Sequence, residues 1–211
     1  MAQIEPHVVV EDPSSLCSLG LRPIIVHGFL IEHLRRHFQD TANIQDPSIR
    51  QYLWKANVDR ESIIIDSVAR WNPAAASARP AILLRRNPWQ VTHTGIGANL
   101  MHGSRTESGQ DNFSIIMGGS HTIFCIARES GECEVLAAEV YLELLEFSAI
   151  IREKAELLRF QVTEIGQMQP IDEAREHFGI PITVAYAHNH SWKVIHQKPV
   201  LNTVDLAVFR P

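Results

Sequence analysis

The sequence predicts an α+β fold: a mainly antiparallel sheet packed by a long helix and an N-terminal helix, with an extended N-terminal arm. Two observations lead to this prediction. Apolar residues recur with helical spacing in two stretches, one near the start of the chain and one over residues 130–160. The other apolar segments are short, rich in β-branched residues and mostly follow one another without intervening helices, which argues against a doubly wound parallel sheet.

The composition limits the class of protein. A chain of 211 residues suits one domain, and we expect an arm over residues 1–21 and a single α+β domain over residues 22–211. The formal net charge of -5 argues against nucleic-acid binding by the whole monomer. Three cysteines without a CxxC pair indicate neither a disulfide scaffold nor a zinc ribbon. No signal-peptide pattern and no apolar run of about 20 residues is present, so no membrane association is expected.

The N-terminal third is predicted to hold the arm and one helix. Residues 1–21 contain two prolines and one short valine run, and are expected to be extended. Pro23 is suited to the first turn of a helix, which should run to about Asp40. Its apolar face comprises Val26, Phe29, Leu30, Leu34 and Phe38.

The sheet is predicted from segments on both sides of the long helix. The expected strands are residues 61–71, 79–89, 113–127, 160–165 and 179–187, and residues 91–103 are expected to be strand or loop. Residues 192–195 are expected either to pair with the last of these strands or to continue it. Pro80 and Pro88 cannot donate to a ladder, so the strand that contains them is expected near an edge. A bend is expected at Gly118–Gly119. Residues 167–177 are expected to hold a short helical turn, and residues 104–110 the polar tip of a hairpin that reaches a partner.

The long helix, residues 130–160, carries three kinds of surface. One apolar face, which should pack on the sheet, consists of Leu136, Val140, Leu144, Phe147, Ile151, Ala155 and Leu158. A narrow acidic stripe consists of Glu132, Glu139, Glu143, Glu146 and Glu153, and is expected to face solvent or, as the alternative, a DNA channel. A third, apolar strip contains Leu142, Leu145 and Ala149. A helix covered only by its own sheet needs no such strip, so we expect another helix or a second subunit to cover it.

Histidine pairs give the alternative hypothesis, a small metal-dependent enzyme. His33 and His37 stand four residues apart on one face of the first helix, as metal ligands can, but position 34 is Leu where a metalloprotease pattern has Glu. A polar flank of an amphipathic helix is the favoured interpretation. His188 and His190 are expected in a polar turn, or else on one side of a strand. Nucleophile and Walker motifs are missing from the sequence, so no enzymatic activity, catalytic residue, cofactor or bound metal is expected.

A candidate partner surface is predicted around the strand that contains AILL. Arg79, Arg85 and Arg86 flank this strand, and Trp89 follows it. Arginine and tryptophan are enriched at binding hot spots, although charged residues at the end of an edge strand also prevent association. The complete set of expected partner contacts also takes in the hairpin tip and the third strip of the long helix. It consists of Arg79, Arg85, Arg86, Trp89, Arg105, Leu142 and Leu145.

A family resemblance follows from segments that together span about Arg79 to Ile195: RPAILLRR, GGSHTIFCIARESGECEVLAAEVYLELLEFSAIIR, FQVTEIG, FGIPITVAYA and SWKV. Their order and pattern resemble the tail terminator, or tail completion, proteins of long-tailed bacteriophages. The resemblance implies a subunit of a ring, commonly hexameric, that caps the tail tube and joins it to the head connector or stopper protein in the virion neck. The implied partners include copies of the same chain and, in some tails, the sheath, with the genome passing through as cargo. Assembly would take place in the host cytoplasm. Another neck or baseplate component is the related alternative.

Overall fold

The computed structural model describes residues 8–9, 23–56, 62–71, 80–92, 102–105, 110–171 and 174–196. The helices are α1 (Pro23–His37), α2 (Ser130–Glu146) and α3 (Ser148–Lys154), and a 3-10 turn spans Val68–Arg70. The strands are β1 (Val8–Val9), β2 (Ile64–Ser67), β3 (Ala81–Arg86), β4 (Gln90–Thr92), β5 (His102–Arg105), β6 (Gln110–Ala127), β7 (Arg159–Ile165), β8 (Gln169–Ile171) and β9 (Ala174–His196). Apart from β1, the predicted arm lies outside the described residues.

Contacts divide the chain into two compact units. One comprises residues 21–91 and 117–188, and holds all three helices. The other comprises residues 1–20, 92–116 and 189–211. In the second unit, β5 pairs with the start of β6 as an antiparallel hairpin, in which Arg105 lies opposite Asp111. This pairing confirms that a hairpin forms here, whereas its contact with a partner stays a prediction. Ser104, Arg105 and Gln110 belong to its strands, and its tip lies outside the described residues.

The sheet of the helical unit is mainly antiparallel, which confirms the predicted α+β class. Its strands lie in the order β9-β6-β3-β2, and β7 and β8 also pair with β9. β2 and β3 are a parallel pair, which the sequence did not predict. β3 lies between β6 and the edge strand β2, so it is near an edge as expected but is not itself the edge strand. Pro80 and Pro88 fall just outside its paired residues and remove no ladder hydrogen bond from β3.

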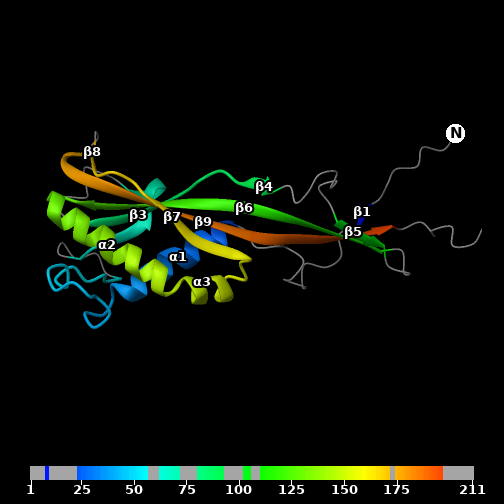
Figure 1. Cartoon of the computed structure of the whole chain (residues 1–211), viewed down its shortest axis with the longest axis horizontal. Helices are drawn as coiled ribbons and strands as arrows, with labels where there is room; N and C mark the ends of the chain where they lie inside the picture. Colours follow the sequence, from blue (N-terminus) through cyan, green and yellow to red (C-terminus); the bar gives the residue numbers. More distant parts are fainter. Residues whose placement is uncertain are drawn as a thin grey trace, which may run out of the picture. The chain divides into compact units, whose positions relative to one another are not determined.

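All three helices pack on one face of this sheet (Figure 1). The alternation of β3 explains how the two faces differ: Ile82 and Leu84 join the large core under the helices, whereas Ala81 and Leu83 point to the opposite face. The large core also contains Leu30 and Leu34 of α1, Leu136, Val140 and Leu144 of α2, Ile123 of β6 and Ile182 of β9. A smaller cluster on the other face includes the partly buried Trp71.

The predicted long helix is two helices. A break at Phe147 separates α2 from α3, although the hydrogen bond from Ile151 N to Phe147 O, 2.8 Å long, bridges the junction. The second helix ends at Lys154 because Glu156 has a φ of 51°, and Leu157 N bonds back to Arg152 O. Leu158 therefore lies beyond the helix and is 55% exposed instead of buried. Phe147 is also 36% exposed, while the other predicted core residues of this face are buried.

Strand β9 is much longer than predicted. It begins at Ala174 and pairs with β8, so the expected helical turn over residues 167–177 is a β-hairpin. Good helix formers in this segment did not decide its structure, because sheet pairing overrides weak local propensity. β9 continues through His188 and His190 to His196, so the preferred interpretation of a polar turn was also wrong.

Gly119 allows a close approach between β6 and β9. A Cβ at this position would lie 2.6 Å from the ring and hydroxyl oxygen of Tyr186, much closer than side chains tolerate. The bend that the sequence suggested at Gly118–Gly119 is therefore better explained as space for a neighbouring ring, within a strand that is continuous from Gln110 to Ala127.

Candidate functional site

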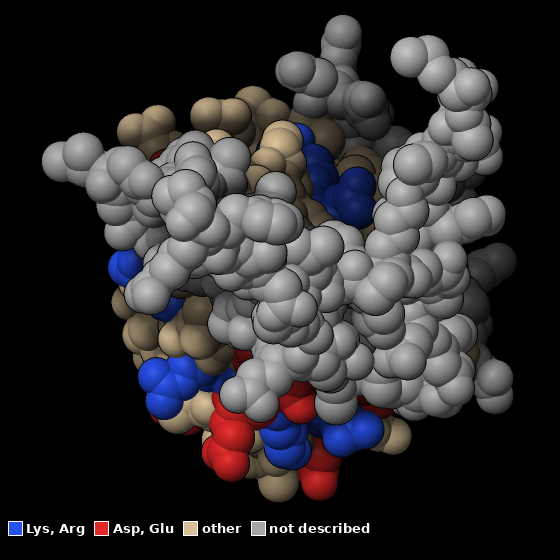
Figure 2. Space-filling model, turned by 90° about the vertical axis from the view of Figure 1, so that its right-hand side faces the viewer, with Lys and Arg blue, Asp and Glu red and all other residues tan. Residues whose placement is uncertain are grey.

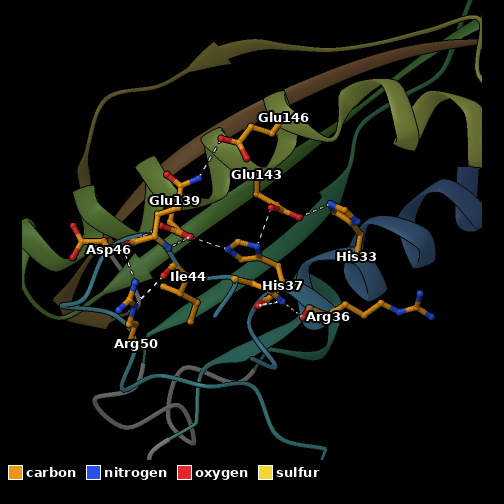
Figure 3. A network of polar contacts seen from close by, with 11 residues as sticks. His33, Arg36, His37, Ile44, Asp46, Arg50, Glu139, Glu143 and Glu146 are labelled. Carbon is orange, nitrogen blue, oxygen red and sulfur yellow. Dashed lines mark hydrogen bonds and ion pairs between the residues drawn. The ribbon is translucent and has the colours of Figure 1, made fainter. Parts of the chain in front are cut away.

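A cluster of two histidines and two glutamates joins α1 to α2 (Figure 3). His37 Nε2 lies 2.9 Å from Glu139 Oε1, and His37 Nδ1 lies 2.9 Å from Glu143 Oε2. His33 Nε2 lies 2.9 Å from the other oxygen of Glu143. The side chains of His37, Glu139 and Glu143 are only 5%, 3% and 7% exposed. The cluster therefore forms part of the protein interior, between two helices that are 93 residues apart in the sequence.

The geometry indicates the charge state of His37. Ionised carboxylates only accept hydrogen bonds, so both ring nitrogens of His37 must carry protons to satisfy Glu139 and Glu143. Burial alone would lower the pKa of His37, but the hydrogen bonds and negative charges of these two glutamates outweigh burial and raise it. Burial would likewise raise the pKa of Glu143, but its contacts with His33 and His37 lower it to about 2. An imidazolium between two carboxylates is the resulting arrangement.

The loop after α1 completes the cluster. Glu139 accepts hydrogen bonds from the backbone N–H groups of Gln45, at 2.9 Å, and Asp46, at 3.3 Å. The Gln45 side chain donates to Glu146, at 3.2 Å. A hydrogen bond from Tyr52 to Glu132, together with burial, raises the pKa of Tyr52 to about 12. Four acids of α2 thus accept hydrogen bonds or ion pairs from α1 and from the loop that follows it.

This arrangement corrects the interpretation of the acidic stripe. Glu139 and Glu143 are buried, so these two residues face neither solvent nor a channel for DNA. The expectation failed because the stripe was considered apart from its partner. Glu139 and Glu143 are four residues apart on α2, and His33 and His37 are four residues apart on α1. This equal spacing of acids on one helix and histidines on the other was the signal that could have predicted the cluster.

The chemistry of the cluster is that of a structural ion pair. Its carboxylate oxygens are already engaged by imidazole and amide nitrogens, and no group of three His, Cys, Asp or Glu side chains that could hold a metal ion occurs in the described segments. The second pair, His188 and His190, lies on one side of β9. His188 is buried against the edge of Trp89, with ring centroids 5.7 Å apart. Neither histidine pair belongs to a metal-binding group among the residues that the structure describes.

The predicted partner-contact residues fall in three places. Arg85 and Arg86 are exposed at the end of β3, where the Arg85 guanidinium lies over the Phe124 ring at 5.0 Å. Trp89 is half-buried next to His188, so it serves partly as core. Arg79 lies outside the described residues, and for Arg105 only the backbone, in β5, is described. The structure thus brings Arg85, Arg86 and Trp89 to one end of β3.

The third strip of the predicted long helix is an exposed apolar surface. Leu142 and Leu145 are 38% and 43% exposed, and Ile150 on α3 is 42% exposed. We call these three residues, together with the exposed Phe147 and Ala149 at the junction of the two helices, the α2–α3 strip. The opposite side of the same helices supplies the buried residues Leu136, Val140 and Leu144 to the core. Large apolar residues gathered in this way mark interaction surfaces more often than single exposed leucines do.

Charges are mixed on the visible described surface. In the view of Figure 2, acidic and basic side chains lie interspersed in its lower part, without a large area of one sign. The pattern matches the modest net charge of -5 and differs from the clustered Lys and Arg that phosphate binding requires.

No protein-family model matches the chain, and no curated protein matches it either. Among the described helices, none is both long and apolar enough to cross a membrane.

Proposed function

We propose that this chain is a structural virion protein that associates with copies of itself, as a tail terminator subunit at the head–tail junction of a long-tailed bacteriophage. Its neighbours would be further copies in a ring, commonly of six, the tail tube protein and the head connector or stopper protein. The sheath is an additional partner if the tail is contractile. The observation that carries the self-association part is the α2–α3 strip.

The strip supports a protein partner through its chemistry. Burying Leu142, Leu145 and Ile150 against apolar side chains removes exposed hydrocarbon from water, at roughly 25 cal/mol for each Å². Acidic and basic side chains, including Glu146, Glu153 and Arg152, border the strip and provide a polar rim. An apolar centre with a charged rim is typical of interfaces between protein subunits.

The phage-specific part rests on the order of elements and the segment pattern over residues 79–195. A sheet with helices on one face, preceded by a terminal segment, is compatible with a subunit that contacts neighbours at its sheet and helix surfaces. The net charge of -5 suits a protein that lets DNA pass without holding it, because strong binding requires clustered cations.

The second candidate function, a metal-dependent enzyme, receives less support. His33 and His37 are already paired with Glu139 and Glu143, and the described residues offer no metal-binding group. Metal analysis of the purified protein separates the two functions. Stoichiometric zinc or iron, lost in a His37→Gln variant, would favour the enzyme.

The proposal is tested by electron microscopy of the purified protein, alone and mixed with phage tail tubes. Closed rings in the free protein and density at one end of the tubes are expected. A Leu142→Glu, Leu145→Glu double variant should form no rings, while an Arg152→Gln variant at the rim should still form them. Wild-type particles that remain monomeric and decorate no tube end would contradict the proposal.

A further inference from the structure

The N-terminal half of α1 covers a second group of histidines, separate from the cluster of His33 and His37. His27 of α1 stacks on His121 of β6, with ring centroids 5.2 Å apart, and His121 stacks on Tyr186 of β9 at 5.4 Å. Tyr186 in turn stacks on His188 at 6.4 Å. His121 is fully buried, and His27 and Tyr186 are 7% and 3% exposed. We call His27, His121 and Tyr186 the ring stack.

The ring stack is poorly suited to accept a proton. Both ring nitrogens of His121 and the Nδ1 atom of His27 have no hydrogen-bond partner in the described part of the chain. The charged and titratable groups around the stack are Arg86 of β3, Asp66 of β2, Tyr186 and His188 of β9, and the two histidines themselves. Among the described residues, Asp66 favours a positive charge at His27, and none of the named neighbours of His121 does so.

Burial and positive neighbours keep both histidines neutral. The pKa of His121 falls from 6.5 to about 4, because burial, the charge of His27 and the charge of Arg86 all oppose protonation. Burial and Arg86 also lower the pKa of His27, against the weaker effect of Asp66. A histidine whose pKa is lower in the folded state destabilises that state as the pH falls below about 6.5, down to its folded pKa. At pH 5, for His121 alone, this amounts to a loss of roughly thirtyfold in the equilibrium between the docked and the released helix.

The other end of α1 responds in the opposite sense. Because its carboxylate partners raise the pKa of His37, this histidine is already protonated near neutral pH. Its ion pairs with the glutamates therefore stabilise the folded state in mild acid and are lost in base. Glu143 keeps its charge until the pH falls towards about 2. Between about pH 6.5 and 4.5, the contacts of His37 therefore persist while those of the ring stack weaken.

Gly28 separates the two ends. It follows His27 directly, is exposed, and a Cβ at this position would meet no atom within 4 Å. Packing therefore does not require a glycine here. Glycine within a helix costs about 1 kcal/mol relative to alanine, so Gly28 is the poorest helix former in the interior of α1.

We propose that α1 is an acid-sensitive latch: mild acid releases its first turns, Pro23–His27, from the sheet about Gly28, while the turns that carry His33 and His37 remain docked on α2. The proposal rests on the stack of buried rings at one end, the glutamate contacts at the other and the glycine between them. It does not depend on the proposed virion function. Release would uncover the β6 and β9 side chains beneath Val26 and His27 to a partner.

Hydrogen exchange of the full chain, resolved by peptide, tests the latch at about pH 7.5 and about pH 5, with rates corrected for the intrinsic effect of pH. We expect amide protection over residues 24–30 to fall at least tenfold in acid, and protection over residues 33–38 to change less than twofold. Gly28→Ala should reduce the acid response by stiffening the helix. His121→Phe, which keeps a ring in the stack but cannot titrate, should abolish most of it.

Two further variants, a replacement and a control, complete the experiment. His27→Phe serves if His121→Phe does not fold, and His177→Asn, which removes a histidine of β9 away from α1, is the matched control that should keep the full response. Equal loss of protection along the whole helix would overturn the latch. An undiminished acid response in the phenylalanine variant that folds, or imidazole resonances of His27 and His121 that titrate at or above 6.5 in wild type, would overturn it too.

Discussion

The Nδ1 atom of His37 on α1 lies 2.9 Å from the Oε2 atom of Glu143 on α2, in the protein interior, and each of these side chains is less than a tenth exposed. His37 also contacts Glu139, and Glu143 also contacts His33, so one chain of contacts crosses the helix interface. A buried ion pair adds little net stability over an apolar pair, but removal of one partner leaves the other charge buried and unpaired. The cluster thus specifies how α1 and the loop after it dock on α2.

The Glu143→Gln variant tests this role. The amide keeps the shape of the side chain but leaves the His37 charge with one carboxylate in place of two. We expect the free energy of unfolding to fall by about 3 kcal/mol, measured by chemical denaturation. Glu153→Gln, at an exposed position of α3, is the control and should change stability by less than about 0.5 kcal/mol. Equal, small effects of both substitutions would show that the cluster is not coupled to folding.

The raised pKa of His37 predicts a loss of stability in base. A histidine with a folded pKa above its unfolded value of 6.5 contributes stability that is complete below about pH 6.5 and disappears as the pH rises through the folded pKa. Unfolding free energies of wild type should therefore decline on the alkaline side of neutrality. His37→Gln should be less stable at pH 6 and lack this decline. A wild-type profile that is flat or rises over this range would refute the assigned charge state.

The close approach of Gly119 to Tyr186 predicts a large effect from a single methyl group. Gly119→Ala places a Cβ 2.6 Å from the Tyr186 ring, and we expect a loss of about 1–3 kcal/mol from overpacking. Gly131→Ala is the matched control, since it meets no atom within 4 Å in α2 and should be neutral or slightly stabilising. In a Gly119→Ala, Tyr186→Leu double variant the two effects should be less than additive. Strict additivity would mean that the two residues do not conflict.

Much of the fold could be predicted from local pattern. The α+β class, the start of α1 at Pro23, the start of α2 at Ser130 and strand β7 all follow from periodicity and helix-start signals. The predictions failed where pairing with another strand of the sheet determines the structure of a segment. The segment before Gly179 contains helix formers but pairs with β8, and β2 and β3 follow each other in the sequence but form a parallel pair. Neither outcome can be determined from one segment alone.

The candidate site was only partly predictable. His33 and His37 were singled out by their spacing, but their partners Glu139 and Glu143 were assigned to solvent or a channel. The ring stack was missed, since His27, His121 and Tyr186 come from three distant segments and no short motif links them. Helical phase predicted that Leu142 and Leu145 face away from the sheet and are covered by another helix or a second subunit, because two apolar faces on one helix cannot both face the same sheet. The structure leaves both side chains exposed in the single subunit, so cover by a second subunit stays a prediction.

The most direct measurement of the central claim is the native mass of the purified protein over a wide range of concentrations. We predict a discrete closed oligomer for wild type and a monomer for the Leu142→Glu, Leu145→Glu double variant. The variant should still unfold cooperatively, because both side chains are exposed in the single subunit, with a midpoint no higher than that of the wild-type oligomer. A wild-type protein that stays monomeric at every concentration, or a double variant with the same oligomer as wild type, would contradict self-association through the α2–α3 strip.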